Sequence, residues 1–150
     1  KDLYMYNQGR SRYVFGAYLY AERAKGIKGF LQWHMFATHG YQFFDLDGRE
    51  PDDGVIAVTA RGVRPTLDLE RCRQGVNDFR CFLTLERLLA RAEEAGRDEA
   101  AAPGRAFLRE LTAKISLRET EKPDWLDLDD ARRRAVDEIV RLTGLETGSP

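Results

Sequence analysis

The stretch that most constrains the fold is the run from Gly26 to His34, in which apolar residues end in a large aromatic and a titratable ring. We predict a buried β-strand over residues 28–34. A helix-like segment, residues 11–25, comes before it, and a shorter apolar run, residues 3–7, comes before that helix. Strand, helix and strand within about 30 residues have the size of one βαβ unit. The start of the chain therefore predicts two adjacent parallel strands.

That topology singles out four side chains as candidate ligand contacts. Tyr6 and Asn7 end the first predicted strand, and Trp33 and His34 end the second. In α/β folds, ligands bind beside the carboxyl ends of the strands. We therefore expect all four residues at one rim. The indole of Trp33 can stack on the apolar face of a sugar, although a tryptophan that fills the core is the other interpretation.

Capping residues and hydrophobic spacing set the expected limits of the helices. We expect helices over residues 11–25, from near Thr66 to Gly96, from Pro103 onward, and from Asp127 to Gly144. Residues 98–104 read as a polar, alanine-rich linker. A core stripe on the second of these helices is expected at Leu69, Cys72, Val76, Phe79 and Leu83, widened by Phe82, Leu85 and Leu89. The face of the last helix is expected at Val136, Ile139, Val140 and Leu142.

Two segments resemble a known enzyme family. Residues 29–33, GFLQW, resemble the Gly-Phe-Leu-Arg-Trp strand of glycoside hydrolase family 123 and its relatives (domain of unknown function 4091), with Gln32 in place of the arginine. Residues 73–79, RQGVNDF, resemble the Arg-Glu-Gly-Ile-Glu-Asp-Tyr segment on the family's following helix. Tyr6-Asn7 and Asp53-Gly54 are also similar in placement, so that the resemblance spans roughly residues 3–90.

The resemblance implies an α/β fold, namely the C-terminal part of a TIM-type (β/α)8 barrel over residues 1–97. A helical C-terminal extension, residues 98–145, and a disordered tail, residues 146–150, would follow. The family cleaves β-linked N-acetylgalactosamine or a related sugar, with the substrate's acetamido group as nucleophile and an Asp-Glu pair to assist it. That pair maps to no position of this chain.

By this resemblance the chain contributes substrate-binding residues, Trp33, Tyr6, Asn7 and His34, and no catalytic residue. Its partners would be a carbohydrate substrate and the remainder of the barrel, from sequence upstream of this segment. The segment alone is then expected to be inactive, and the family resemblance implies an extracellular or periplasmic location. Two alternatives stay open: a non-catalytic carbohydrate-binding or scaffolding member of the same fold, and a small helical interaction module.

Composition and spacing argue against several other classes of function. Lys and Arg total 24 against 25 Asp and Glu, so no basic excess favours a nucleic-acid partner. No apolar run approaches the roughly 20 residues that a membrane span needs. We expect no cofactor, and no metal site either, because His34, His39 and the acidic residues 45–53 match no familiar ligand spacing. Cys72 and Cys81 lie too far apart on one helix to form a disulfide.

Charged residues on the predicted helices receive a structural interpretation. Asp78 stands beside core positions of the long helix, so we expect an ion pair or a tether to a loop there. The run Arg132–Arg134 is surrounded by acidic residues and is expected to form a solvated helix face.

Overall fold

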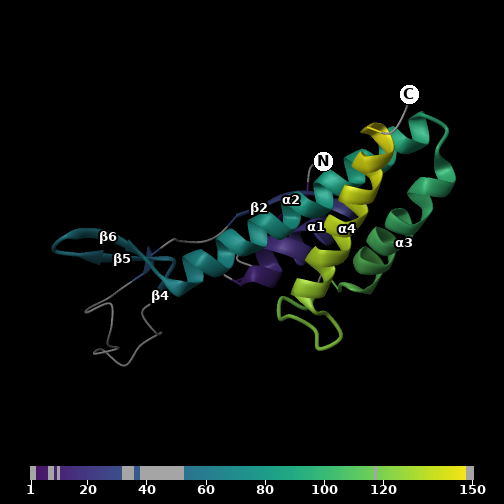
Figure 1. The fold of residues 1–150 in the computed structure, drawn as a ribbon. Coiled ribbons are helices and arrows are strands. Elements are labelled where there is room, and N and C mark those ends of the chain that lie inside the picture. Colours follow the sequence, from purple (N-terminus) through teal and green to yellow (C-terminus); the bar gives the residue numbers. More distant parts are fainter. Residues whose placement is uncertain are drawn as a thin grey trace.

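The computed structural model describes residues 3–6, 9, 11–31, 36–37, 53–116 and 118–147. Its elements are β1 (Leu3–Tyr6), η1 (Val14–Tyr18), α1 (Leu19–Ala24), β2 (Ile27–Leu31), β3 (Phe36–Ala37), β4 (Asp53–Gly54), β5 (Ile56–Thr59), β6 (Gly62–Pro65), α2 (Leu67–Glu94), α3 (Asp98–Lys114) and α4 (Leu128–Thr147). Figure 1 shows α1, α3 and α4 gathered around the C-terminal part of α2. The β5–β6 hairpin extends away from them at the N-terminal end of α2.

The first two strands pair as the sequence predicts. β1 and β2 are parallel, with Leu3 opposite Ile27 and Tyr6 opposite Leu31. The helical segment between them, η1 and α1, packs on β2 and on α2. Each of the sheets in the described part of the chain contains two strands, so the eight-stranded barrel stays a prediction of the family resemblance.

The helix between these strands begins and ends at the expected residues. The backbone N–H of Val14 donates to Ser11 Oγ over 3.2 Å. Gly26 follows the helix with a φ of 93°, a left-handed conformation that glycine adopts without strain. Five residues in the middle, η1, are π-helical and continue into the regular turns of α1. Local capping chemistry therefore sets both ends of this segment.

The limits of α2 also agree with the sequence, and its buried face agrees at Cys72, Phe82, Leu85 and Leu89 but not at the other expected positions. Thr66 Oγ1 caps the helix by accepting from the N–H of Leu69, and Gly96 follows its end with a φ of 71°. The expected stripe residues Leu69, Val76, Phe79 and Leu83 are only partly buried. The fully buried positions are Cys72, Gly75, Asp78, Phe82, Leu85, Leu88, Leu89 and Ala92. Gly75 and the ion-paired Asp78 thus lie at the centre of this face. A pattern of apolar residues cannot predict such positions.

The C-terminal helices differ from the expectation in extent and in facing. α3 begins at Asp98, so residues 98–104 are helical rather than a linker, and Pro103 lies inside the helix. Alanine favours helix, and a proline near the helix start removes few backbone hydrogen bonds. α4 begins after the expected cap, where Asp127 Oδ1 accepts from the N–H groups of residues 129 and 130, and it continues past Gly144.

The face of α4 that packs on the rest of the molecule is made of smaller residues than expected. Val136 and Val140 are exposed, at 39% and 63% of their surface. Ala131 and Ala135 are buried in their place, whereas Leu142 is buried as expected and Ile139 is partly buried against the core. The alanines permit a close approach to α2, with which α4 makes extensive contacts.

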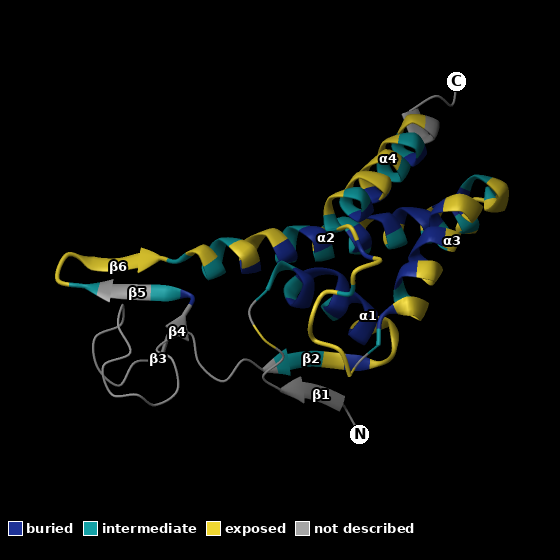
Figure 2. Cartoon of the chain, turned by 90° about the horizontal axis from the view of Figure 1, so that it is seen from below, coloured by how far each residue is buried: buried dark blue, intermediate teal, exposed yellow. Residues whose placement is uncertain are grey.

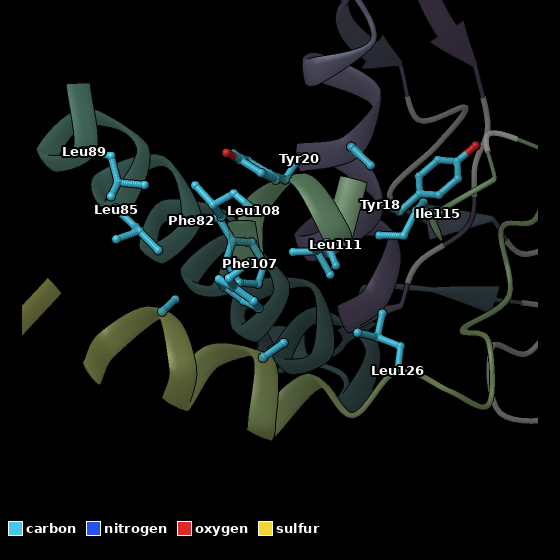
Figure 3. Packing of buried hydrophobic residues seen from close by; sticks show 14 of the residues in the cluster. Tyr18, Tyr20, Phe82, Leu85, Leu89, Phe107, Leu108, Leu111, Ile115 and Leu126 are labelled. Carbon is cyan, nitrogen blue, oxygen red and sulfur yellow. The ribbon is translucent and has the colours of Figure 1, made fainter. Parts of the chain in front are cut away.

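One hydrophobic core joins η1, α1, α2, α3 and α4. Figure 3 shows Phe82 of α2 facing Phe107 of α3, and the ring centroids of these residues lie 6.3 Å apart. Figure 2 shows that the buried residues concentrate where the helices meet, whereas β6 is exposed along its length. The division at residues 97 and 98 stays a prediction, although side chains from both sides of it share this core. Residues 148–150 of the expected tail lie outside the described part.

Candidate functional site

The carboxyl ends of β1 and β2 meet at one edge of their sheet. Tyr6 is the last residue of β1 and Leu31 the last of β2, and the two are opposite each other in the parallel register. The chain that follows each strand therefore starts from the same edge, as expected for a rim. Asn7, Trp33 and His34 lie outside the described residues, and so does the side chain of Tyr6. Their placement at the rim stays a prediction.

A groove opens beside the loop that follows β1. It has a volume of 610 Å³ and runs from Gly9, Ser11 and Arg12 to residues of α2 and of the α3–α4 connection. Gly9 has a φ of 98°, so the loop turns there through a conformation that other residues rarely adopt. The remaining lining residues are Tyr13, Val14, Arg71, Gln74, Thr120, Glu121, Lys122 and Leu128.

A buried ion network anchors that loop to two helices. The Asp78 carboxylate is 0% exposed and accepts from Arg12 Nε over 2.7 Å and from Arg132 Nε. Arg12 also donates to Asp129 Oδ1 over 2.6 Å and to the Leu128 carbonyl over 3.2 Å. Burial lowers the pKa of Arg12, but the bonds to Asp78 and Asp129 outweigh this effect and raise it. Asp78 thus holds the start of η1, α2 and α4 together.

Two glycines allow the helices to approach at this network. A Cβ on Gly75 would lie 2.5 Å from the carbonyl oxygen of Arg12 and 2.8 Å from Phe15 Cβ. A Cβ on Gly16 would lie 3.1 Å from Asp78 Cβ. Gly16 therefore lies directly against α2. Gly75 and Asp78 belong to the segment that resembles the hydrolase family, and packing explains why these residue types stand there.

The expectation of an ion pair at Asp78 is confirmed, whereas that for Arg132–Arg134 is wrong in part. Arg132 binds Asp78 and donates to the Gln74 carbonyl over 2.9 Å. The guanidinium of Arg134 lies over the Phe107 ring, 4.5 Å from its centroid. Arg133 alone of the three pairs with a residue of its own helix, Asp130. Both oxygens of Asp78 are used, so we assign it a positioning role and no proton transfer.

A second buried acid, Glu22, lies in the same helical segment. Its side chain is 1% exposed, and neither oxygen has a hydrogen bond of good geometry within the described part of the chain. Burial raises the pKa of Glu22 to about 7, while the nearby Tyr18 hydroxyl lowers it. Burial and the Glu22 charge raise the pKa of Tyr18 to about 12. A carboxyl with a pKa near neutrality suits proton transfer, although no described cavity reaches it.

Sequence reasoning missed the contributions of Arg12 and Glu22. Arg12 follows the helix cap in a stretch with other charged residues, and its partners lie 66 and 117 positions away. Glu22 stands between Ala21 and Arg23, and the apolar spacing of the segment does not distinguish it from a surface residue. The faint signal for Glu22 is its position four residues after Tyr18, which places both on one face of the helix.

The described residues hold no group of three His, Cys, Asp or Glu that could bind a metal ion. His34, His39 and most of the acidic loop lie outside those residues, so the candidate ligands weighed from the sequence are not placed. Cys72 and Cys81 are free thiols, as their spacing predicts. Within the described ranges, every helix is too short or too polar to cross a membrane.

Comparison with known proteins assigns no family to this chain. Neither the protein-family models, nor the curated proteins, nor the solved structures contain a match to this sequence.

Proposed function

We propose that the chain is the C-terminal part of a barrel-type glycoside hydrolase that acts on β-linked N-acetylhexosamine glycans. In this proposal it forms one wall of the sugar site and leaves the catalytic acid pair to preceding sequence. The observation that carries the proposal is the parallel pair β1–β2, whose carboxyl ends coincide at Tyr6 and Leu31. A helix joins the two strands, as in the repeating unit of such a barrel.

The four candidate residues take different roles in this proposal. Trp33 supplies a flat apolar surface for the sugar ring. Tyr6 and Asn7 hydrogen-bond the acetamido group or a ring hydroxyl, and His34 completes the wall. Such contacts promote hydrolysis only if they strengthen as the ring distorts toward the transition state.

In this proposal the Asp78 network anchors the loop that leads from the rim to η1. Arg12 lies five residues after Asn7, and its guanidinium is fixed by Asp78, Asp129 and the Leu128 carbonyl. The loop between β1 and η1 therefore starts from an ordered strand and ends at an anchored side chain. Precise placement of a substrate needs side chains that are held on anchored elements, and Arg12 is such an anchor at the start of η1.

Two other functions remain as alternatives, and they differ in how many of these observations they explain. A non-catalytic carbohydrate-binding or scaffolding member of the fold would keep the rim and lack the Asp-Glu pair. A small helical interaction module agrees with the helical core, but it gives no reason for the parallel pairing of β1 and β2. The sequence that precedes residue 1 in the gene distinguishes the first two, because the acid pair is either present or missing there.

The test uses the longer protein that carries the barrel. Hydrolysis of an aryl N-acetyl-β-galactosaminide is measured for wild type and for Trp33→Ala. We expect kcat/KM to fall about 100-fold or more, or by roughly 3 kcal/mol of transition-state stabilisation, with an unchanged circular dichroism spectrum. Residues 1–150 alone should show no hydrolysis. Normal kinetics of Trp33→Ala, or turnover by residues 1–150, would contradict the proposal.

A matched pair of tyrosine variants separates the rim from the rest of the fold. Tyr6→Phe removes a hydroxyl at the proposed site and should lower kcat/KM. Tyr20→Phe removes a hydroxyl that donates to Glu86 Oε2 over 3.1 Å on the helical side. It should leave kcat/KM unchanged. Equal effects of the two substitutions would show that loss of a tyrosine hydroxyl acts through stability rather than through substrate.

A further inference from the structure

Trp125 is an exposed aromatic outside the proposed rim. It lies in the connection between α3 and α4, and 48% of its surface is accessible. It is the only aromatic among the large hydrophobic residues that the described part of the chain leaves exposed. A single exposed aromatic is ordinary on a protein surface, so a binding role for Trp125 depends on what lies around the ring.

Two hollows meet at Trp125, which lines both together with Leu126 and Asp127. The first, between α3 and α4, has a volume of 180 Å³. The Lys114 ammonium lines it and lies 5.6 Å from the centroid of the Trp125 ring. The second has a volume of 460 Å³, and Lys114 does not line it. The second hollow is a shallow, open depression of the surface, so a ligand there would rest against the ring and stay partly in solvent.

The loop that carries Trp125 is held in place by its neighbours. Leu126 is 4% exposed and is part of the hydrophobic core. Its N–H donates to the Pro123 carbonyl over 3.1 Å. Lys122 Nζ donates to the carbonyls of Pro123 and Leu126, over 3.2 and 3.1 Å. The indole therefore stands on an ordered turn, and a ligand would not have to order it.

Three aspartates, Asp124, Asp127 and Asp129, line the second hollow together with the indole. Asp124 has no ion pair or hydrogen bond to any residue that the structure describes, and it is exposed. Asp129 uses one oxygen for Arg12, while its side chain stays 81% accessible. A flat ring next to free carboxylate oxygens matches the surface of a sugar, whose C–H face is apolar and whose hydroxyls donate hydrogen bonds.

A cationic ligand is the competing occupant of this hollow, because Asp124, Asp127 and Asp129 line it against a single lysine, Lys122. Aromatic rings also attract cations through their electron-rich faces, although Lys114 already uses this attraction in the first hollow. A neutral sugar uses the apolar surface of the ring and the acceptor oxygens of Asp124 together, and a cationic probe in the experiment below distinguishes the two occupants. We propose that Trp125 and Asp124, in the second hollow, bind one neutral pyranose unit of a glycan. This site is separate from the rim, and it stands whether or not the rim belongs to a hydrolase.

The chain has two tryptophans, so each site carries its own reporter. The indole N–H signals of ¹⁵N-labelled residues 1–150 are assigned with Trp33→Phe and Trp125→Phe. Cellobiose and N-acetylgalactosamine are then titrated, with choline chloride at matched ionic strength as the cationic probe. We expect at least one of the two sugars to shift the Trp125 signal in a saturable way in the millimolar range, also in the Trp33→Phe variant. Choline should leave the signal unchanged.

Two substitutions test the composition of the site. Asp124→Ala removes the free carboxylate and should weaken sugar binding at Trp125 several-fold. Lys114→Met keeps the length of the side chain but removes the charge, and it should retain sugar binding. Both side chains are exposed, so the backbone spectrum should keep its dispersion and verify the fold.

Each remaining outcome contradicts this inference in a recognisable way. If neither sugar shifts the Trp125 signal, the second hollow is no sugar site. If choline shifts it and sugars do not, the ring is a cation site. If sugars shift only the Trp33 signal, the rim proposal gains support while the Trp125 site fails. A Trp125 response without a Trp33 response supports the site and leaves the rim proposal to its own kinetic test.

Discussion

Asp78 and Glu22 are both buried carboxylates, but they differ in what surrounds them. Two arginines bind Asp78, so its charge is compensated and each oxygen has a partner. Glu22 has no arginine or lysine partner in the part of the chain that the structure describes. A buried charge without a partner is costly, and the group responds by holding its proton to a higher pH. The first acid therefore joins helices, and the second makes stability depend on pH.

We expect Glu22→Gln to stabilise the protein at alkaline pH. The pKa of Glu22 is about 7 in the folded state and 4.5 as the ordinary value. Its contribution to stability is full below pH 4.5 and is lost as pH rises through 7, because the ionised form is buried. Glutamine resembles the protonated acid at every pH. Chemical denaturation should show equal stability near pH 4.5 and an advantage of about 1–3 kcal/mol for the variant at pH 8.

Glu110 provides a control of opposite sign. A hydrogen bond from Lys114, over 2.7 Å, lowers the pKa of Glu110. Its contribution to stability is therefore present above the ordinary pKa and is lost as pH falls. Glu110→Gln should lower stability slightly at pH 8 and leave it unchanged at low pH. A pH-independent difference for Glu22→Gln would show that its carboxyl is solvated or paired in the folded protein.

The residue roles that sequence could predict are those with local causes. The caps at Ser11, Thr66 and Asp127 act within three residues of the backbone groups that they bind. The partners of Asp78 lie 54 and 66 positions away, so the sequence indicated an ion pair and could not say with which residue. The same limit applies to Glu22, because its burial results from the packing of the whole helix.

Among the elements, the limits of α2 were predicted correctly from the sequence, but part of its buried face was not. Apolar spacing selected Val76 and Phe79, but the line of closest approach to η1 passes through Gly75 and Asp78. Neither of those residues is hydrophobic, so a pattern of apolar residues places the face slightly off. The C-terminal half of the helix has ordinary core residues, and there the prediction for Phe82, Leu85 and Leu89 is confirmed.

We expect Gly75→Ala to lower the free energy of unfolding by about 1–3 kcal/mol. The added methyl would lie 2.5 Å from a backbone oxygen, which cannot move without shifting η1 against α2. Gly144→Ala is the matched control, since a Cβ at Gly144 meets nothing within 4 Å. That substitution should raise stability by up to about 1 kcal/mol, as alanine favours helix. Urea denaturation of both variants measures the difference, and equal effects would remove the close contact from the packing of α2.

At the scale of the whole molecule, the helices share one hydrophobic core, whereas the described strands pair only in twos. The core consists of side chains from η1, α1, α2, α3 and α4. Sequence predicted residues 98–145 as an added helical piece, because nothing in it resembles the hydrolase family. Its docking depends on small residues: a Cβ on Gly104 would lie 2.9 Å from Leu89 Cδ2. Such complementarity between distant surfaces cannot be read from hydrophobic spacing, which reports one element at a time.

The β5–β6 hairpin is the element farthest from this core, and its stability tests the barrel proposal. All four residues of β6 are exposed, with Val63 at 60%, and Leu67 at the start of α2 is 67% accessible. An isolated two-stranded hairpin is marginal in water. In residues 1–150 we therefore expect its amide hydrogens to exchange rapidly, while those of α2 around Leu85 and Leu89 exchange only through global unfolding. In the longer protein, β5 should become protected if it pairs with a further strand. Hydrogen-exchange mass spectrometry on both forms gives the comparison. Equal protection of β5 in the two forms would argue that no barrel strand lies beside it.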